Sequence, residues 1–102
     1  MPDLRGLTIV VAGADPERFG LALALAAAHA ALGGRACVYA HRAAVTLLQR
    51  SSEVDAALEL GVRFIACQSG LAEHGLAIPD FAEGGGLVSL LAALGDDRLV
   101  TV

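Results

Sequence analysis

The chain has 102 residues, of which 56% are hydrophobic, and it carries a formal net charge of −4. Its seven basic residues are all arginines and are scattered singly, which excludes nucleic acid as an expected partner because phosphate binding needs clustered positive charge. The lack of lysine also excludes Schiff-base chemistry and the lysine of a phosphate-binding P-loop.

Size and hydrophobicity together predict a single domain, residues 1–102, that assembles with copies of itself. The hydrophobic fraction exceeds the usual ~45–50%, so the surplus apolar residues should lie in subunit contacts or in helices buried on several sides. The opening MPDLRG lacks the features of a signal peptide. The longest apolar run, Phe19–Leu32, is shorter than the ~20 residues of a membrane span. We therefore expect a cytoplasmic protein with no membrane partner and with two free cysteines rather than a disulfide.

The first half of the chain predicts two strands joined by a long helix. Leu7–Ala12 is a continuous, β-branched apolar run, which is typical of a strand buried on both faces of a parallel sheet. Asp15 then supplies a helix cap. The helix Pro16–Leu32 is apolar nearly all round, which indicates that it is covered on more than one side. Arg35–Ala40 is the second predicted strand, and His41 begins its exit loop.

The second half predicts shorter elements that alternate in the same way. Pro79 favours a loop or a short edge strand over Leu76–Phe81, and Gly84–Gly86 favours a turn over an anion-binding nest. Ser52 is the expected cap of its helix. We expect helices at Ala43–Gln49, Glu53–Leu60, Ser69–Glu73 and Leu87–Leu94, and strands at Val62–Cys67 and Arg98–Val102. This alternation predicts an α/β fold, a three-layer α/β/α sandwich with a mainly parallel sheet of four to five strands.

Three side chains are expected at the carboxyl edge of this sheet, where sites gather in open parallel folds: Asp15, His41 and Cys67. Cys67 precedes a helix start, where free N–H groups and the helix dipole lower the pKa of a thiol. A nucleophilic or sulfur-carrying thiolate needs such a position, and the alternative is a buried cysteine that packs as a small apolar residue. His41 and His74 are candidate acid–base partners, and the alternative for each is a solvated loop histidine.

The other candidate residues and motifs favour packing over chemistry. Cys37 lies mid-strand between apolar neighbours and is expected to pack in the core, and His29 is expected at the surface or an interface. No G-x-G-x-x-G follows the first strand, no G-x-S-x-G is present, and His and Cys are not grouped at metal spacing. We therefore expect neither a cofactor nor a metal.

The segment Val62–Leu76, VRFIACQSGLAEHGL, is similar to the cysteine segment of the DsrE/DsrF-like proteins. In that family a strand ends in a cysteine, a short helix follows, and a glycine lies eight residues after the cysteine, as Gly75 does here. Gly84–Leu91 and Arg98–Val102 resemble the closing helix and strand of the family. The resemblance implies a trimer or hexamer in which Cys67 carries sulfur as a persulfide.

Two functions are open on this basis. The first is a sulfur carrier or sulfurtransferase, in which Cys67 accepts sulfane sulfur from a donor protein and passes it to an acceptor protein, with His41 and His74 as candidate neighbours. The second is a non-catalytic, homo-oligomeric binding or scaffold protein in which Cys67 only packs. Glu73 and His74 stand where family members often carry basic residues, so the resemblance does not identify the acceptor.

Overall fold

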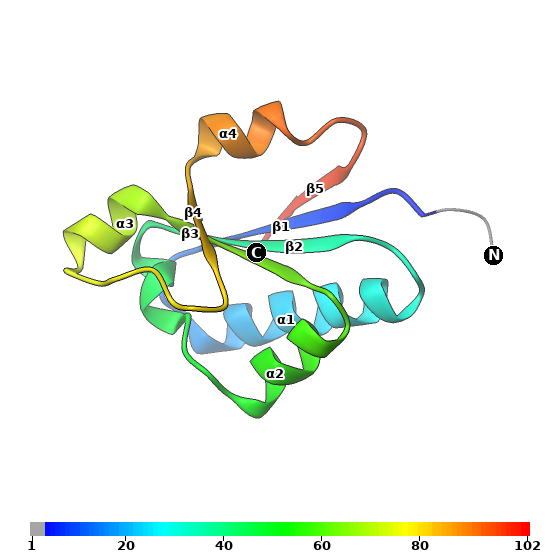
Figure 1. Cartoon of the computed structure of the whole chain (residues 1–102), viewed down its shortest axis with the longest axis horizontal. Helices are drawn as coiled ribbons and strands as arrows, with labels where there is room; N and C mark the ends of the chain where they lie inside the picture. Colours follow the sequence, from blue (N-terminus) through cyan, green and yellow to red (C-terminus); the bar gives the residue numbers. More distant parts are fainter. Residues whose placement is uncertain (1–3) are drawn as a thin grey trace.

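A computed structural model describes residues 4–102 and shows one all-parallel sheet of five strands, in the order β4-β3-β2-β1-β5 (Figure 1). The strands are β1 (Leu7–Ala12), β2 (Ala36–His41), β3 (Arg63–Cys67), β4 (Glu83–Gly85) and β5 (Arg98–Thr101). The helices are α1 (Pro16–Ala31), the 3-10 helix η1 (Arg42–Leu47), α2 (Ser52–Glu59), α3 (Gln68–Glu73) and α4 (Leu87–Ala92).

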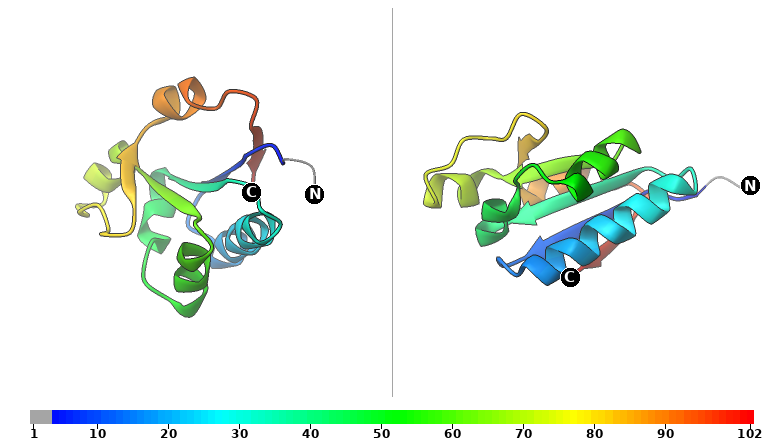
Figure 2. Two further views of the ribbon diagram at one scale, coloured as in Figure 1. Left: turned by 45° about the vertical axis from the view of Figure 1, so that its right-hand side comes forward. Right: turned by 90° about the horizontal axis from the view of Figure 1, so that it is seen from below.

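The helices cover both faces of the sheet. Helices α1 and α2 pack side by side on one face and α4 lies over the other, while α3 extends from the edge at which β3 ends (Figures 1 and 2). This arrangement confirms the predicted α/β/α sandwich with a parallel sheet. Because all strands run the same way, every strand ends at the edge where α3 and η1 begin.

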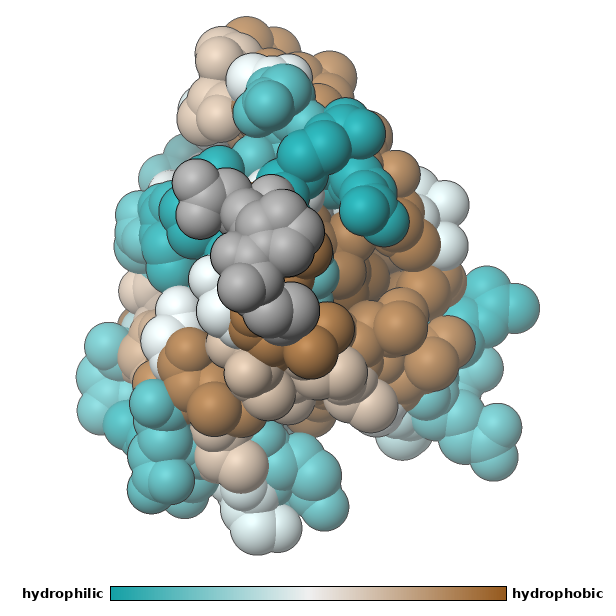
Figure 3. All heavy atoms as spheres, turned by 90° about the vertical axis from the view of Figure 1, so that its right-hand side faces the viewer, coloured by the Kyte–Doolittle hydropathy of each residue, from teal (hydrophilic) through white to brown (hydrophobic). Residues whose placement is uncertain are grey.

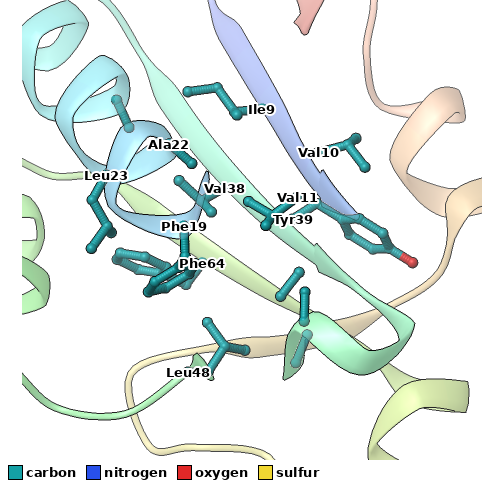
Figure 4. Packing of buried hydrophobic residues seen from close by; sticks show 14 of the residues in the cluster. Ile9, Val10, Val11, Phe19, Ala22, Leu23, Val38, Tyr39, Leu48 and Phe64 are labelled. Atoms are coloured by element: carbon teal, nitrogen blue, oxygen red, sulfur yellow. The ribbon is translucent and has the colours of Figure 1, made fainter. Parts of the chain in front are cut away.

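The main core lies between the sheet and α1. Ile9, Val38 and Phe64 point from three neighbouring strands toward Phe19 of α1, and all four side chains are buried (Figure 4). Tyr39 leaves β2 on the opposite face, as the alternation of side chains along a strand requires (Figure 4). Burial of each such side chain contributes roughly 1.5–3 kcal/mol, so a one-residue slip of register, which would turn these side chains outward, is strongly disfavoured.

The predicted helix caps are confirmed in one case and wrong in the other. Asp15 caps α1, and its carboxylate accepts a hydrogen bond of 2.9 Å from the backbone N–H of Glu17. Helix α2 is capped by Ser51 and not by Ser52, since the Ser51 hydroxyl accepts from the Val54 N–H at 3.1 Å. The two consecutive serines offer the same side chain, and the position that precedes the first helical turn acts as the cap.

The prediction for the glycine-rich segment Gly84–Gly86 is wrong. Gly84–Gly86 was expected to be a turn, whereas Glu83–Gly85 forms the edge strand β4, which pairs with β3. A Cβ on Gly85 would lie 2.8 Å from a methyl carbon of Ile65. The glycine therefore allows a close approach of β4 to β3 that a larger residue would hinder, and the pairing is decided by the neighbouring strand rather than by strand propensity. Leu76–Phe81 is a loop, one of its two predicted states.

Candidate functional site

Cys67 lies at the junction of a strand and a helix. It is the last residue of β3 and the N-cap of α3, and it is 4% exposed. Its Sγ accepts a hydrogen bond of 3.4 Å from the backbone N–H of Gly70. The sulfur thus takes the place that a serine or aspartate oxygen commonly occupies at the start of a helix.

The environment of Cys67 favours the thiolate. Burial raises the pKa of the Cys67 thiol, but hydrogen bonds from the backbone N–H groups of Arg42, Gly70 and Ser69, together with the nearby Tyr39 hydroxyl, outweigh it. The pKa therefore lies below its ordinary value. Donors that converge on a sulfur stabilise its charged form, and this is how proteins activate a cysteine without a neighbouring cation.

A close contact between η1 and α3 brings these donors together. Arg42 adopts a left-handed conformation with φ of 52°, which is uncommon outside glycine. A Cβ on Gly70 would overlap the carbonyl oxygen of Arg42 and lie 2.8 Å from its carbonyl carbon. On the exposed side, the Arg42 guanidinium forms a two-point ion pair with Glu73, at 2.7 and 2.8 Å. The backbone of Arg42 therefore faces the sulfur while its side chain faces solvent.

Tyr39 and His41 flank the sulfur from β2. Their ring centroids are 5.9 Å apart, and both leave the strand on the face of α4. The register pairs Ala40 with Ala66, so His41 and Cys67 follow side by side at the ends of adjacent strands. Tyr39 is fully buried. Within residues 4–102, its hydroxyl and the His41 Nδ1 are buried and have no hydrogen-bond partner of good geometry.

The Tyr39 hydroxyl nevertheless acts on Cys67. It lies near enough to the sulfur to lower the thiol pKa, although it is not aligned as a complete hydrogen bond. Burial, together with the neighbouring Cys67, raises the pKa of Tyr39 far above its usual range, so the hydroxyl stays protonated at neutral pH. Tyr39 was missed in the sequence, and the signal that points to it is its place two residues before His41 on the same face of a strand.

Cys37 provides a contrast within the same sheet. It is half-buried and lines a cavity of about 370 Å³ beneath α4, so it packs only partly in the core. Burial raises the pKa of the Cys37 thiol to about 11, although Arg63 opposes the shift. Cys37 pairs with Arg63 in the register, so Cys67 lies four residues farther along, about 13 Å away at ~3.3 Å per residue. Both cysteines are free, as predicted.

The other predicted site residues are not brought to the sulfur. His74 is exposed at the C-cap of α3. The six residues of α3 lie between it and Cys67, which separates the two Cα atoms by about 10 Å at ~1.5 Å per residue. Asp15 caps α1 and lies 3.6 Å from the Arg18 guanidinium. His29 is at the surface, with its Nε2 2.8 Å from the Arg5 carbonyl oxygen. Of the two histidines proposed as partners of the cysteine, only His41 lies at the end of the strand next to the one that Cys67 ends.

No protein-family model matches the chain, and no curated protein matches it. Between residues 4 and 102, no helix is both long enough and apolar enough to cross a membrane. Over the same range, no three His, Cys, Asp or Glu side chains are grouped as the ligands of a metal ion would be.

Proposed function

We propose that the protein is a sulfur carrier or sulfurtransferase that holds sulfane sulfur as a persulfide on Cys67. The observation that carries the proposal is the set of donor groups from Arg42, Ser69, Gly70 and Tyr39 around Cys67. These donors lower the pKa of the Cys67 thiol although the thiol is buried. The similarity of Val62–Leu76 to the cysteine segment of the DsrE/DsrF-like family supports the same function.

Loading requires a thiolate and a persulfide donor. The Cys67 thiolate attacks the outer sulfur of a donor persulfide, R–S–SH. A new S–S bond forms on Cys67, the donor's S–S bond breaks, and the donor leaves as the thiolate R–S⁻ with the electron pair of that bond. The proton stays on the transferred sulfur and nothing is oxidised or reduced overall. A lowered thiol pKa increases the fraction of Cys67 that can attack at neutral pH.

Delivery is the same exchange in reverse. An acceptor thiolate attacks the outer sulfur of the Cys67 persulfide, and Cys67 leaves as a thiolate. Leaving groups of lower pKa depart faster in this chemistry. The N–H groups of Gly70 and Arg42 stabilise that leaving thiolate as they stabilise the attacking one, so one arrangement of donors serves both directions.

We infer a homotrimer or homohexamer in the cytoplasm, with donor and acceptor proteins as further partners. Several large apolar side chains are exposed, and Figure 3 shows hydrophobic surface at the top of the molecule, where α4 lies, and again across the middle of this face. The exposed large hydrophobic residues of α4 and β5 are Leu87, Val88, Leu91 and Leu99. Exposed apolar area of this kind is typical of protein contacts.

The same surface supports a second candidate, a non-catalytic homo-oligomeric scaffold in which Cys67 only packs. Its specific support is Val88, which is 86% exposed on α4. In a scaffold, a cysteine that is 4% exposed should react with alkylating reagents no faster than other buried thiols.

Paired cysteine variants decide between the two functions. Each of Cys37→Ser and Cys67→Ser is incubated with a persulfide donor, and the intact mass is measured. We expect the Cys37→Ser protein to gain the mass of one sulfur atom and the Cys67→Ser protein to gain none. Alkylation against pH should show a Cys67 thiol that titrates below ~8.5. An unmodified Cys37→Ser protein whose thiol titrates at or above that value would favour the scaffold.

A further inference from the structure

We propose that Tyr39 and His41 form a subsite for the outer sulfur of the Cys67 persulfide. The inference deepens the proposed function and rests on it. The backbone donors of η1 and α3 hold the inner sulfur, and the two β2 side chains receive the atom that is carried.

Two buried polar atoms at the end of β2 have no hydrogen-bond partner among residues 4–102. A buried hydroxyl that makes no hydrogen bond costs free energy, and native proteins rarely leave one unpaired without a reason. The Tyr39 hydroxyl and the His41 Nδ1 are both unpaired within residues 4–102, and they belong to neighbouring rings that are tilted by 30° to each other, with centroids 5.9 Å apart. An acceptor atom between these rings and Cys67 would satisfy both.

The outer sulfur of a persulfide is such an atom. It extends one S–S bond, about 2.05 Å, beyond Sγ. On the α3 side the inner sulfur already accepts from the Gly70 N–H, whereas on the β2 side the Tyr39 hydroxyl and the His41 Nδ1 make no complete hydrogen bond. Tyr39 stays protonated at neutral pH because burial raises its pKa, so it can donate to a sulfur anion. The His41 Nδ1 can do the same in the tautomer that carries its proton there.

The charge around the subsite fits a small anion of single charge. The titratable groups that flank Cys67 are Tyr39 and His41 on β2, Arg42 on η1 and Glu73 on α3. Arg42 and Glu73 neutralise each other in a two-point ion pair on the exposed side. The subsite therefore stabilises its ligand with hydrogen bonds rather than with net positive charge, which suits a hydropersulfide better than a multiply charged oxyanion.

The proposal predicts that Tyr39→Phe separates stability from function. Phenylalanine keeps the ring and removes an unpaired hydroxyl, so the unfolding midpoint should stay the same or rise. Without the hydroxyl, the Cys67 persulfide should lose its outer sulfur to an excess of a low-molecular-weight thiol about tenfold faster, the equivalent of one charge-assisted hydrogen bond. The pKa of the Cys67 thiol should also rise. A higher pKa slows the departure of Cys67 as a leaving group, so faster release in this variant would come from the lost contact with the outer sulfur.

The experiment uses the Cys37→Ser protein as the parent, and Tyr39→Phe, His41→Gln and His74→Gln are made in it. All are loaded with glutathione persulfide and followed by intact mass, and their thiols are titrated by alkylation rate against pH. We expect Tyr39→Phe and His41→Gln to load but to release sulfur faster. His74→Gln, altered at the far end of α3, should behave like the parent.

The outcomes separate this inference from the function on which it rests. If the parent takes up no sulfur, both are wrong. If the parent loads and the Tyr39→Phe and His41→Gln proteins match it in release rate and thiol pKa, sulfur carriage stands and the subsite is wrong. An effect limited to one of the two variants would also overturn a subsite made of both residues.

Discussion

Gly70→Ala should disrupt the site at its most crowded point. Gly70 is in the first turn of α3, its N–H donates to the Cys67 sulfur, and a Cβ there would overlap the backbone of Arg42. Backbone cannot rotate away as a flexible side chain can, so the added methyl must push α3 and η1 apart. The N–H groups of Gly70 and Arg42 would then move away from the sulfur together.

Two opposing terms set the size of the effect. Alanine in place of glycine within a helix gains roughly 0.5–1 kcal/mol, whereas forcing extra volume into a packed contact costs about 1–3 kcal/mol. We expect a net loss of about 1–2 kcal/mol in the free energy of unfolding, with the melting temperature falling by about 4–8 °C per kcal/mol. Weaker donation to the thiolate should raise the pKa of the Cys67 thiol back toward its ordinary value.

Denaturant unfolding and alkylation against pH, both in the Cys37→Ser protein, measure the two effects. The matched control is Gly20→Ala, because Gly20 lies within α1 and an added Cβ would contact nothing within 4 Å. That variant should gain roughly 0.5–1 kcal/mol and leave the Cys67 titration unchanged. A Gly70→Ala protein that is as stable as Gly20→Ala, or that keeps the parent's thiol pKa, would show that the contact with Arg42 does not build the site.

Two further predictions concern other parts of the molecule. The pKa of the Cys37 thiol is 9.0 in the unfolded chain and about 11 in the folded protein. Between pH 9 and 11 the folded state therefore binds the thiol proton more tightly than the unfolded chain does. The ionisation of Cys37 should therefore lower the free energy of unfolding from pH 9 to 11, and the contribution of Cys37 is at most about 2–3 kcal/mol. Urea titrations at each pH should show this fall in the natural chain and a smaller one in Cys37→Ala, and equal slopes would contradict it. The exposed Leu87, Val88 and Leu91 of α4 favour self-association. The resemblance to the DsrE/DsrF-like proteins implies a trimer or hexamer, and a monomer mass by light scattering at micromolar concentration would contradict both.

The order of elements was predictable because its signals are local. An apolar run such as Leu7–Ala12 and the cap at Asp15 act within a few residues, and they gave strand and helix bounds close to those observed. The position of Cys67 followed in the same way, since a strand that ends just before a helix must place its last residue at the helix start. Local signals failed at Gly84–Gly86, where pairing with β3 forms a strand that glycine does not favour.

The donors around Cys67 were not predictable in the same way, because they depend on which elements meet in space. Nothing in the sequence shows that Arg42 adopts a left-handed conformation or that Gly70 must pass close to its carbonyl. Tyr39 reaches the site only because β2 and β3 are neighbours in the sheet, and the sequence did not give the strand order. His74, close to Cys67 in sequence, is carried away from it by α3.

The two cysteines show why the end of a strand matters more than burial. Cys37 and Cys67 lie on adjacent strands and the same face of the sheet, yet the pKa of Cys37 is raised and that of Cys67 is lowered. Cys37 lies within β2, which has paired strands on both sides, so the nearby backbone N–H groups are engaged in the sheet. Burial is then the largest influence on its pKa, and Arg63 opposes it only in part. Cys67 lies one residue beyond the last pair between β2 and β3, where the first turn of α3 leaves its N–H groups free. A buried thiol becomes acidic there because the fold supplies unpaired donors at the same point, and a thiol moved back into the strand would lose them.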